Sequence, residues 1–228
     1  MITLLIANKN YSSWSLRPWV LLRSLGIAFE EVLIPFGSSP PGGSIVERSP
    51  SGKVPCLLDG ELQVWDSLAI TEYVAESHPQ VWPRDRVARA WARSAAAEMH
   101  AGFQALRTVC NMSCGQRVAL HSTPAALVAD LGRLDALWQD GLARFGGPFL
   151  AGGVFTAVDA FFAPVAFRVQ TYGLALSAPS MAYVARLLAL PAMAEWYAAA
   201  LAEPWRDAAH EAETQAAGRV TADLRRTA

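Results

Sequence analysis

The most constraining feature of the sequence is an apolar run, Ile2–Ala7, followed directly by the polar stretch Asn10–Arg17. The run is typical of a buried strand, and the serines at Ser12 and Ser13 predict the start of a helix that continues to Leu25. Hydroxyl side chains favour helix starts because their oxygens accept the unpaired backbone N–H groups there. Since a helix N-terminus carries about half a positive charge, this turn is suited to hold an anion such as a thiolate or a phosphate.

The first third of the chain, residues 1–78, predicts a small α/β domain with a mixed sheet. A strand–helix–strand unit of this length should form a right-handed parallel crossover, and Asp59-Gly60 is a strong hairpin turn that makes the last two strands antiparallel. The further elements expected are strands at Phe29–Pro35, Val54–Leu58 and Glu61–Trp65, and a helix from Asp66 to before Pro79. Residues 79–84, with two prolines, are the predicted linker.

Beyond the linker, in residues 85–228, every periodic pattern is helical. Apolar residues from Val87 to Cys110 follow one face of a long helix, and those from Leu127 to Phe145 follow another. Thr156 and Asp159 resemble a capping box ahead of a third. Two shorter helices are expected at Ser180–Leu190 and Pro191–Leu201, and the polar tail after Arg206 is expected to fray. The fold class is therefore α/β plus all-α.

Composition narrows the function. A net charge of -1 gives no electrostatic case for nucleic acid, and the apolar N-terminus is too short for a signal or membrane segment. Three cysteines do not make a disulfide framework, which indicates the reducing cytoplasm. Cys110 and Cys114 lie four residues apart, but no nearby His or Cys completes a metal site, so buried structural thiols are expected and no metal.

The chain resembles the cytosolic glutathione transferases over nearly its full length, on the order and spacing of three motifs. Ser12–Arg17 is similar to the hydroxyl-rich active-site turn of the zeta class, which includes maleylacetoacetate isomerases; Trp14 stands where that class has cysteine. Ser49–Pro55 is similar to the family's loop ending in a cis-proline, and Asp66-Ser67 matches its acidic-residue–serine pair. The resemblance implies a thioredoxin-like domain before a helical one, glutathione as co-substrate, and a homodimer.

The catalytic candidates are Ser12 and Ser13. A glutathione thiol starts near the free-cysteine pKa of about 8.5, so holding it as thiolate at neutral pH requires about 2.7 kcal/mol. A hydroxyl donor to a charged group contributes about 1.5–3 kcal/mol and a helix N-terminus about 0.3–1 kcal/mol, so no separate base is needed. The resemblance places the thiolate-facing hydroxyl at Ser12. Ser13 and Tyr11, the donor type of other classes, are the alternatives, and capping of the helix is the structural role that serines play in any case.

The resemblance also implies a binding site for the tripeptide. Pro55 would follow a cis bond and turn the backbone of Val54 to pair with glutathione, whereas an ordinary trans-proline at a strand start is the alternative. Asp66 and Ser67 would receive the γ-glutamyl end, although pure helix caps would look the same. Lys53 would reach the glycyl carboxylate or remain solvated.

The second-substrate pocket is expected between the domains. Its predicted residues are Tyr11, Met99, Phe103, Arg107, Arg168 and Tyr172. His100 has no visible Asp or Ser partner, which favours a plain surface or core histidine. Zeta-class isomerases carry a substrate-carboxylate arginine where this chain has Thr171, and Arg168 lies about one helical turn earlier, a departure that weakens the isomerase interpretation.

The sequence therefore predicts a cytoplasmic glutathione transferase that activates glutathione as a thiolate for attack on small electrophiles, a detoxification chemistry. Two alternatives stay open: a glutathione-dependent cis–trans isomerase, and a non-catalytic binding protein that keeps the fold. A reductant acting through a nucleophilic cysteine is disfavoured because no cysteine lies within Tyr11–Ser15.

Overall fold

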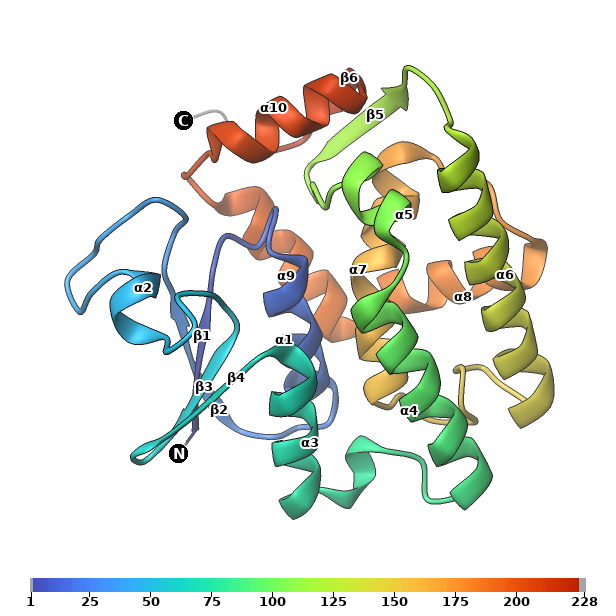
Figure 1. The fold of residues 1–228 in the computed structure, drawn as a ribbon, viewed down its shortest axis with the longest axis horizontal. Helices are drawn as coiled ribbons and strands as arrows, with labels where there is room; N and C mark the ends of the chain where they lie inside the picture. Colours follow the sequence, from blue (N-terminus) through green and yellow to red (C-terminus); the bar gives the residue numbers. More distant parts are fainter. Residues whose placement is uncertain (1, 226–228) are drawn as a thin grey trace.

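The computed structural model describes residues 2–225, and its first part is a mixed four-stranded sheet with strand order β2-β1-β3-β4. Strand β2 pairs parallel with β1, and β3 pairs antiparallel with both β1 and β4. The elements are β1 (Ile2–Ile6), α1 (Ser13–Ser24), β2 (Phe29–Leu33), α2 (Ile45–Arg48), β3 (Cys56–Asp59), β4 (Leu62–Trp65) and α3 (Ser67–Ser77). The predicted thioredoxin-like arrangement is confirmed, and α1 and α3 lie between the sheet and the later helices (Figure 1).

The second part is a bundle of helices around α7, whose residues are nearly all buried. Its helices are α4 (Arg86–Ala101), α5 (Gln104–Val109), α6 (Ala125–Phe145), α7 (Ala157–Tyr172), α8 (Ala178–Leu188), α9 (Pro191–Ala202) and α10 (Ala208–Ala217). The 3-10 helix η1 (Pro79–Val81) lies in the predicted linker, and a domain boundary there stays a prediction. The predicted capping box is present: the Asp159 carboxylate accepts hydrogen bonds from the Thr156 backbone N–H and hydroxyl.

The long helix expected from Val87 to Cys110 is broken in the structure. Helix α4 ends at Ala101, and a Cβ on its C-cap residue Gly102 would lie 2.8 Å from the Glu98 carbonyl oxygen. Phe103 then has a left-handed backbone (φ 54°), which no α-helix continues, and α5 begins after it. The apolar periodicity continues across the break because Met99, Phe103 and Leu106 are all buried, so the pattern did not reveal it.

The C-terminal tail is also more ordered than expected. Instead of fraying after Arg206, the chain forms α10 and then β6 (Gly218–Asp223), which pairs antiparallel with β5 (Gln116–Leu120). The helical part therefore also contains a two-stranded sheet, visible at the top of Figure 1. Arg225 fastens the end of this segment, because its buried guanidinium donates to the Glu211 and Asp223 carboxylates.

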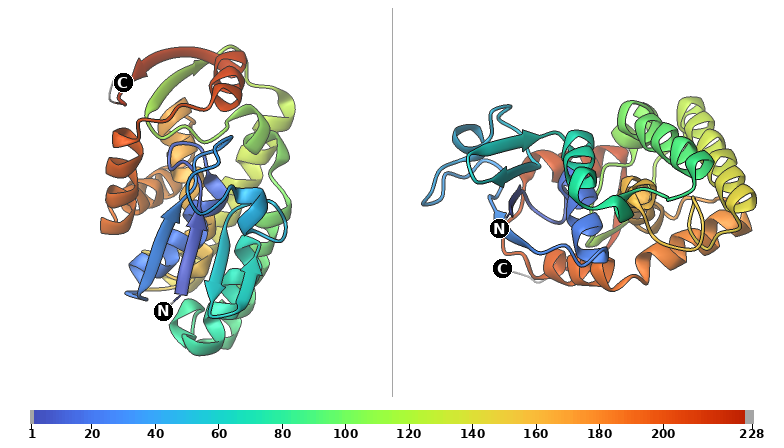
Figure 2. Two further views of the ribbon diagram at one scale, coloured as in Figure 1. Left: turned by 90° about the vertical axis from the view of Figure 1, so that its left-hand side faces the viewer. Right: turned by 90° about the horizontal axis from the view of Figure 1, so that it is seen from below.

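The two parts share one hydrophobic core along α1. Helix α1 packs against α7 and α9, and the Trp19 and Trp196 rings meet edge to face with centroids 5.1 Å apart. Figure 2 shows α9 and the C-terminal segment running back along the sheet domain. Within residues 2–225, no single helix is long and apolar enough to cross a bilayer, and only the bent pair α8 and α9 taken together meets that length and composition.

Candidate active site

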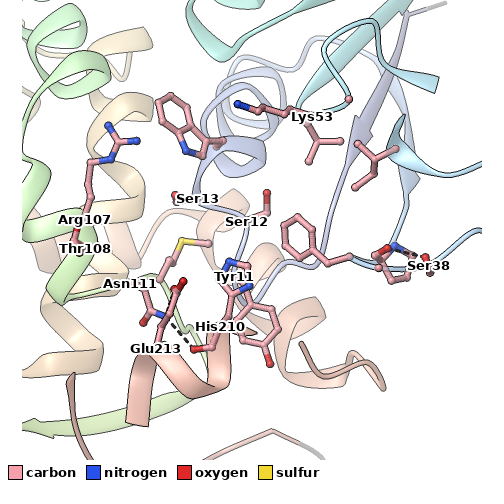
Figure 3. Close-up of a pocket in the computed structure, with 18 of the residues that line it drawn as sticks. Tyr11, Ser12, Ser13, Ser38, Lys53, Arg107, Thr108, Asn111, His210 and Glu213 are labelled. Atoms are coloured by element: carbon pink, nitrogen blue, oxygen red, sulfur yellow. Dashed lines mark hydrogen bonds between the residues drawn. The ribbon is translucent and has the colours of Figure 1, made fainter. Parts of the chain in front are cut away.

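Two cavities meet at the amino end of α1. The larger, about 740 Å³, lies among the β1–α1 turn, the loop after β2, and helices α5, α7 and α10 (Figure 3). The smaller, about 320 Å³, lies beside the β4–α3 junction and is bounded by Pro55, Asp66 and Ser67. Trp14, Lys53 and Val54 line both cavities. An extended ligand could therefore reach from one cavity to the other past these three residues.

The turn that carries the serines is itself buried and depends on partners from the far end of the chain. The Glu203 carboxylate accepts the backbone N–H groups of Lys9 (2.6 Å) and Asn10 (3.3 Å). Trp196 Nε1 donates to the Lys9 carbonyl oxygen (2.9 Å), and the Cys114 N–H donates to that of Asn10. Burial raises the pKa of Glu203. The hydrogen bonds from Lys9 and Asn10 favour the ionised carboxylate and offset only part of this shift. The end of α9 thus fixes the backbone on which Ser12 sits.

Ser12 and Ser13 lie at the cavity wall with different hydrogen bonds (Figure 3). Ser12 is the N-cap residue of α1, but its side chain makes no capping bond and its Oγ donates to Ser15 Oγ (2.7 Å). Ser13 Oγ accepts a hydrogen bond from Arg168 Nη2 (3.3 Å), so its own proton remains available. The structure therefore offers two hydroxyls at a helix N-terminus, one of them polarised by a guanidinium.

Tyr11 was the third donor candidate, and its hydroxyl is engaged elsewhere. It donates to the Glu211 carboxylate and accepts from Arg225 Nη1 (2.7 Å). Burial and the hydrogen bond to Glu211 raise the pKa of Tyr11 to about 12. Its ring still lines the larger cavity, as expected for a second-substrate residue. The hydroxyl faces the C-terminal segment, so Tyr11 does not have the arrangement of a thiolate donor.

Three arginines surround the junction of the two cavities. The guanidinium carbons of Arg17 and Arg107 lie 4.1 Å and 4.4 Å from the centroid of the Trp14 ring. Burial, and after it the charges of Arg107 and Arg168, push the pKa of Arg17 well below its ordinary value. Burial and the charge of Arg107 lower the pKa of Arg168 to about 10. No ion pair to a carboxylate holds any of these three arginines within residues 2–225, so their positive charge at the junction is not neutralised by a direct partner.

The residues expected to bind the tripeptide gather at the smaller cavity. The Val54–Pro55 bond is cis, as predicted. Asp66 caps α3 by accepting the Leu68 N–H (2.7 Å), and Ser67 Oγ accepts a hydrogen bond from Arg17 Nη1 (3.4 Å). Asp66 Oδ2 also lies 3.5 Å from Nε2 of His100, so the expectation that this histidine lacks an acidic partner is wrong. Capping and ligand binding use different atoms of these residues and remain compatible.

Three residues expected in the second-substrate pocket lie elsewhere. Met99 is fully buried in the core on α4, and Phe103 occupies the break between α4 and α5, where its ring packs into the same core. Tyr172 lies behind the wall, with its hydroxyl donating to Asn111 Oδ1. The break at Phe103 interrupts the continuous helix from which the positions of Met99 and Phe103 were predicted. Arg107 and Arg168 do line the larger cavity, as predicted.

Sequence reasoning missed a wall of this cavity. It comes from the loop after β2, the segment after α5, and α10; the side chains are Phe36, Asn111, Met112, His210 and Glu213. None of these residues stands in a recognisable motif. The wall forms because the tail folds back over the cavity, which local patterns in a polar tail do not indicate.

The three cysteines are buried free thiols, as expected. Burial raises the pKa of Cys110 to about 12 and also raises that of Cys56, although a hydrogen bond involving Ser49 opposes the second shift. Because the thiolate is the nucleophilic form, these thiols are poorly suited to covalent chemistry.

Comparison with known proteins identifies relatives of the chain. The family model of the glutathione S-transferase N-terminal domain matches residues 11–77, and that of the C-terminal domain matches residues 119–199. Glutathione S-transferase T1 of Arabidopsis thaliana is 32% identical over 53% of this chain and 55% of its own length. A probable maleylacetoacetate isomerase of Caenorhabditis elegans is 28% identical over 74% of this chain and 79% of its own length. The chain thus spans about half of the first relative and most of the second.

Solved structures share the fold. A glutathione transferase homologue from Burkholderia with bound glutathione superposes with a TM-score of 0.66 at 23% identity, over 87% of this chain and 97% of that one. A maleylacetoacetate isomerase from Methylobacterium extorquens, with bound malonate and glutathione, superposes with a TM-score of 0.66 at 22% identity. The match covers 90% of this chain and 100% of that one. At this identity the likeness concerns the fold.

The buried turn generates a stability prediction. Glu203→Ala should lower the free energy of unfolding by about 3 kcal/mol, because the Lys9 and Asn10 N–H groups would lose their acceptor in a buried place. Glu195→Ala, which removes an exposed carboxylate from the same helix, is the control and should cost less than about 0.5 kcal/mol. Urea denaturation measures both; equal stabilities of the two variants would contradict the assigned role.

Proposed function

Because the chain belongs to the glutathione S-transferase family, we propose that it binds glutathione as a thiolate at the amino end of α1 and transfers it to a small electrophile. The observation that carries this proposal is the pair of serine hydroxyls at a helix N-terminus where two cavities meet. A detoxification role would follow from this chemistry. The experiment that tests it is glutathione binding together with the serine variants described below.

The charges of the site support thiolate formation. The helix N-terminus stabilises an anion by about 0.3–1 kcal/mol, and a hydroxyl donor to a charged group adds about 1.5–3 kcal/mol. The Arg168 guanidinium stands behind Ser13 and adds positive charge in a place where water screens it little. These contributions together reach the roughly 2.7 kcal/mol that moves a thiol pKa of about 8.5 below neutrality.

The smaller cavity supports the orientation of the tripeptide. We propose that the γ-glutamyl end lies beside Asp66 and Ser67, where the N-terminus of α3 attracts its carboxylate and Asp66 Oδ2, the oxygen that does not cap the helix, attracts its ammonium. The backbone of Val54 would pair with the middle of glutathione as an added strand, and Lys53 would reach the glycyl carboxylate. This places the sulfur at the junction, beside Ser12 and Ser13.

A second candidate function is glutathione-dependent cis–trans isomerisation of an anionic substrate. Arg107 and Arg168 line the larger cavity without an ion pair within residues 2–225, and a substrate carboxylate would supply the missing charge. The Thr171 hydroxyl, at the position of the isomerase arginine, donates to the Ser113 carbonyl oxygen (2.8 Å) and is used structurally. Arg168, one turn earlier, takes its place at the cavity. The thiolate would add, the bond would rotate, and glutathione would leave.

A homodimer in the cytoplasm completes the proposal. The free buried thiols fit a reducing compartment. In the dimer that the family resemblance implies, the N-terminal domain of each subunit faces the helical domain of the other. Exposed Trp65 and Leu62 on β4 offer apolar surface for such a contact. A non-catalytic binding protein of the same fold remains the rival to an enzyme.

Glutathione binding and the Ser12 variant test the mechanism. Glutathione at ten times its Kd should stabilise the protein by about 1.4 kcal/mol and raise its melting temperature.

Ser12→Ala should lower turnover by one to two orders of magnitude, corresponding to about 1.5–3 kcal/mol, and shift the pH midpoint of turnover upward. Binding of an S-alkylated glutathione should change little, because a thioether carries no charge.

Ser13→Ala is the matched variant, since it removes the neighbouring hydroxyl, and a larger loss there would assign the thiolate to Ser13. No thermal shift at 10 mM glutathione, with calorimetry equally silent, would refute the transferase proposal. Binding without turnover of any electrophile would favour the non-catalytic rival.

Arg107→Met tests the anionic substrate. With a maleyl diketo acid, KM should rise by about 10- to 100-fold, since a charge-assisted hydrogen bond contributes about 1.5–3 kcal/mol. KM for the neutral 1-chloro-2,4-dinitrobenzene should rise far less. Arg93→Met removes a surface arginine that pairs with Glu72 and serves as the control. Equal effects of Arg107→Met on both substrates would remove the reason for the isomerase candidate.

Sedimentation velocity tests the assembly. At micromolar concentration the protein should sediment as a dimer, and Trp65→Ser should shift it toward the monomer, because removing a buried aromatic side chain from an interface costs about 2 kcal/mol or more. A wild-type monomer at that concentration would contradict the proposed homodimer.

A further inference from the structure

The larger cavity contains a histidine that lies outside both family-model matches. His210 stands on α10, beyond residue 199, and its side chain rises from this helix into the cavity (Figure 3). Its ring is stacked between those of Tyr11 and Phe36, with centroids 5.1 Å and 5.2 Å away and interplanar angles of 23° on both sides. Two aromatic contacts from different segments therefore fix the plane of the imidazole.

Asp207 fixes the second property of the ring, its tautomer. His210 Nδ1 lies 2.8 Å from Asp207 Oδ1, and the same oxygen accepts the His210 backbone N–H (3.1 Å). Burial pushes the pKa of Asp207 upward, but the hydrogen bonds from the His210 ring and backbone outweigh it and hold the pKa below its ordinary value. An ionised Asp207 keeps the proton on Nδ1, so Nε2 is the nitrogen left to exchange protons.

The surroundings leave Nε2 available. Within residues 2–225 it has no hydrogen-bond partner, and the imidazole is about 29% exposed, toward the cavity that it lines. The other charged groups near the ring are Glu213 on the same helix, and Glu211 with Arg225, which bind the hydroxyl of the stacked Tyr11. A carboxylate that orients the far nitrogen of a cavity histidine is an arrangement that general acid–base catalysis uses.

We propose that His210, oriented by Asp207, donates a proton to the second substrate after thiolate addition, and that this substrate is an α,β-unsaturated carbonyl compound. The inference rests on the proposed function, since it requires a glutathione thiolate in the same cavity. The Asp207–His210 pair enters from the C-terminal segment, on a different wall from the serines. One wall holds the nucleophile, and the other holds the acid.

Atoms and electrons are conserved in the proposed addition. The thiolate sulfur forms a bond to the β carbon, and the C=C electron pair moves to give an enolate. The imidazolium Nε2–H then passes its proton to the α carbon, the enolate electrons form that C–H bond, and neutral His210 takes up a proton from water. This proton balances the one that glutathione released on ionising. Displacement of chloride from an aryl chloride needs no such proton, because the chloride leaves with its electron pair.

The test compares an enone, whose addition needs a proton, with an aryl chloride, whose substitution needs none. His210→Phe keeps an aromatic ring in the stack, and Asp207→Asn keeps an N-cap oxygen for α10. Turnover is measured with trans-4-phenyl-3-buten-2-one and with 1-chloro-2,4-dinitrobenzene. We expect His210→Phe to lower kcat for the enone about 100-fold, at least 30-fold more than for the aryl chloride, with Asp207→Asn intermediate. His121→Phe, an exposed histidine away from the cavity, is the control.

A stereochemical measurement tests the proposal even where a variant folds poorly, because it reads the product and not the rate. In D2O the wild type should deliver deuterium to one face of the α carbon, whereas residual product from His210→Phe should carry it on both faces. Equal losses with both electrophiles, retained stereochemistry in His210→Phe, or a wild type active on the aryl chloride alone would each overturn the inference while leaving the proposed function standing. A wild type that binds no glutathione would overturn both.

Discussion

The site depends on one carboxylate that accepts two backbone N–H groups. Residues 8–12 form a buried turn, and a buried backbone must find a hydrogen-bond partner for each polar group. The sheet domain does not supply all of these partners; Glu203, Trp196 and Cys114 come from the helical part. The serines of the N-terminal domain are therefore held in place by the C-terminal domain. Contact between the two parts is a condition of the active-site geometry as well as of stability.

The same burial gives the site its charge. Arg17 and Arg168 are nearly inaccessible to solvent and lack an ion pair within residues 2–225, an arrangement that costs free energy unless other groups compensate. The face of the Trp14 ring offsets part of this cost for Arg17. The Cys110 carbonyl oxygen and the Ser13 hydroxyl, which accept hydrogen bonds from Arg168, offset part of it for that residue. An anionic ligand at the junction would relieve the mutual repulsion of these cations. Burial is the first cause of the lowered pKa values of the arginines, and the same burial would strengthen their attraction for an anionic ligand.

Local chemistry was predictable from the sequence, and distant partners were not. The strand–turn–helix at Ile2–Leu25, the Asp59-Gly60 hairpin and the capping box at Thr156 each depend on neighbours within a few residues, and each is present in the structure. The break at Phe103 was missed because the spacing of buried apolar residues continues across it. The partners of Tyr11 lie 200 and 214 residues away, in a tail whose polar composition resembles a disordered end. No local pattern reports a pairing at that separation.

The C-terminal segment binds the hydroxyl of the tyrosine that precedes α1, whereas the two serines that follow it line the larger cavity. Tyr11 stands next to Ser12 and could supply a phenolic donor, yet Glu211 and Arg225 bind its hydroxyl and its pKa is raised to about 12. The phenol proton is held by a charged carboxylate, which is a stronger acceptor than the neutral Ser15 hydroxyl to which Ser12 donates. The helix α10 that provides Glu211 also carries His210 and stacks it on the Tyr11 ring. The contact that takes one potential donor out of the chemistry therefore brings another titratable group into the cavity, on the side where the electrophile would lie.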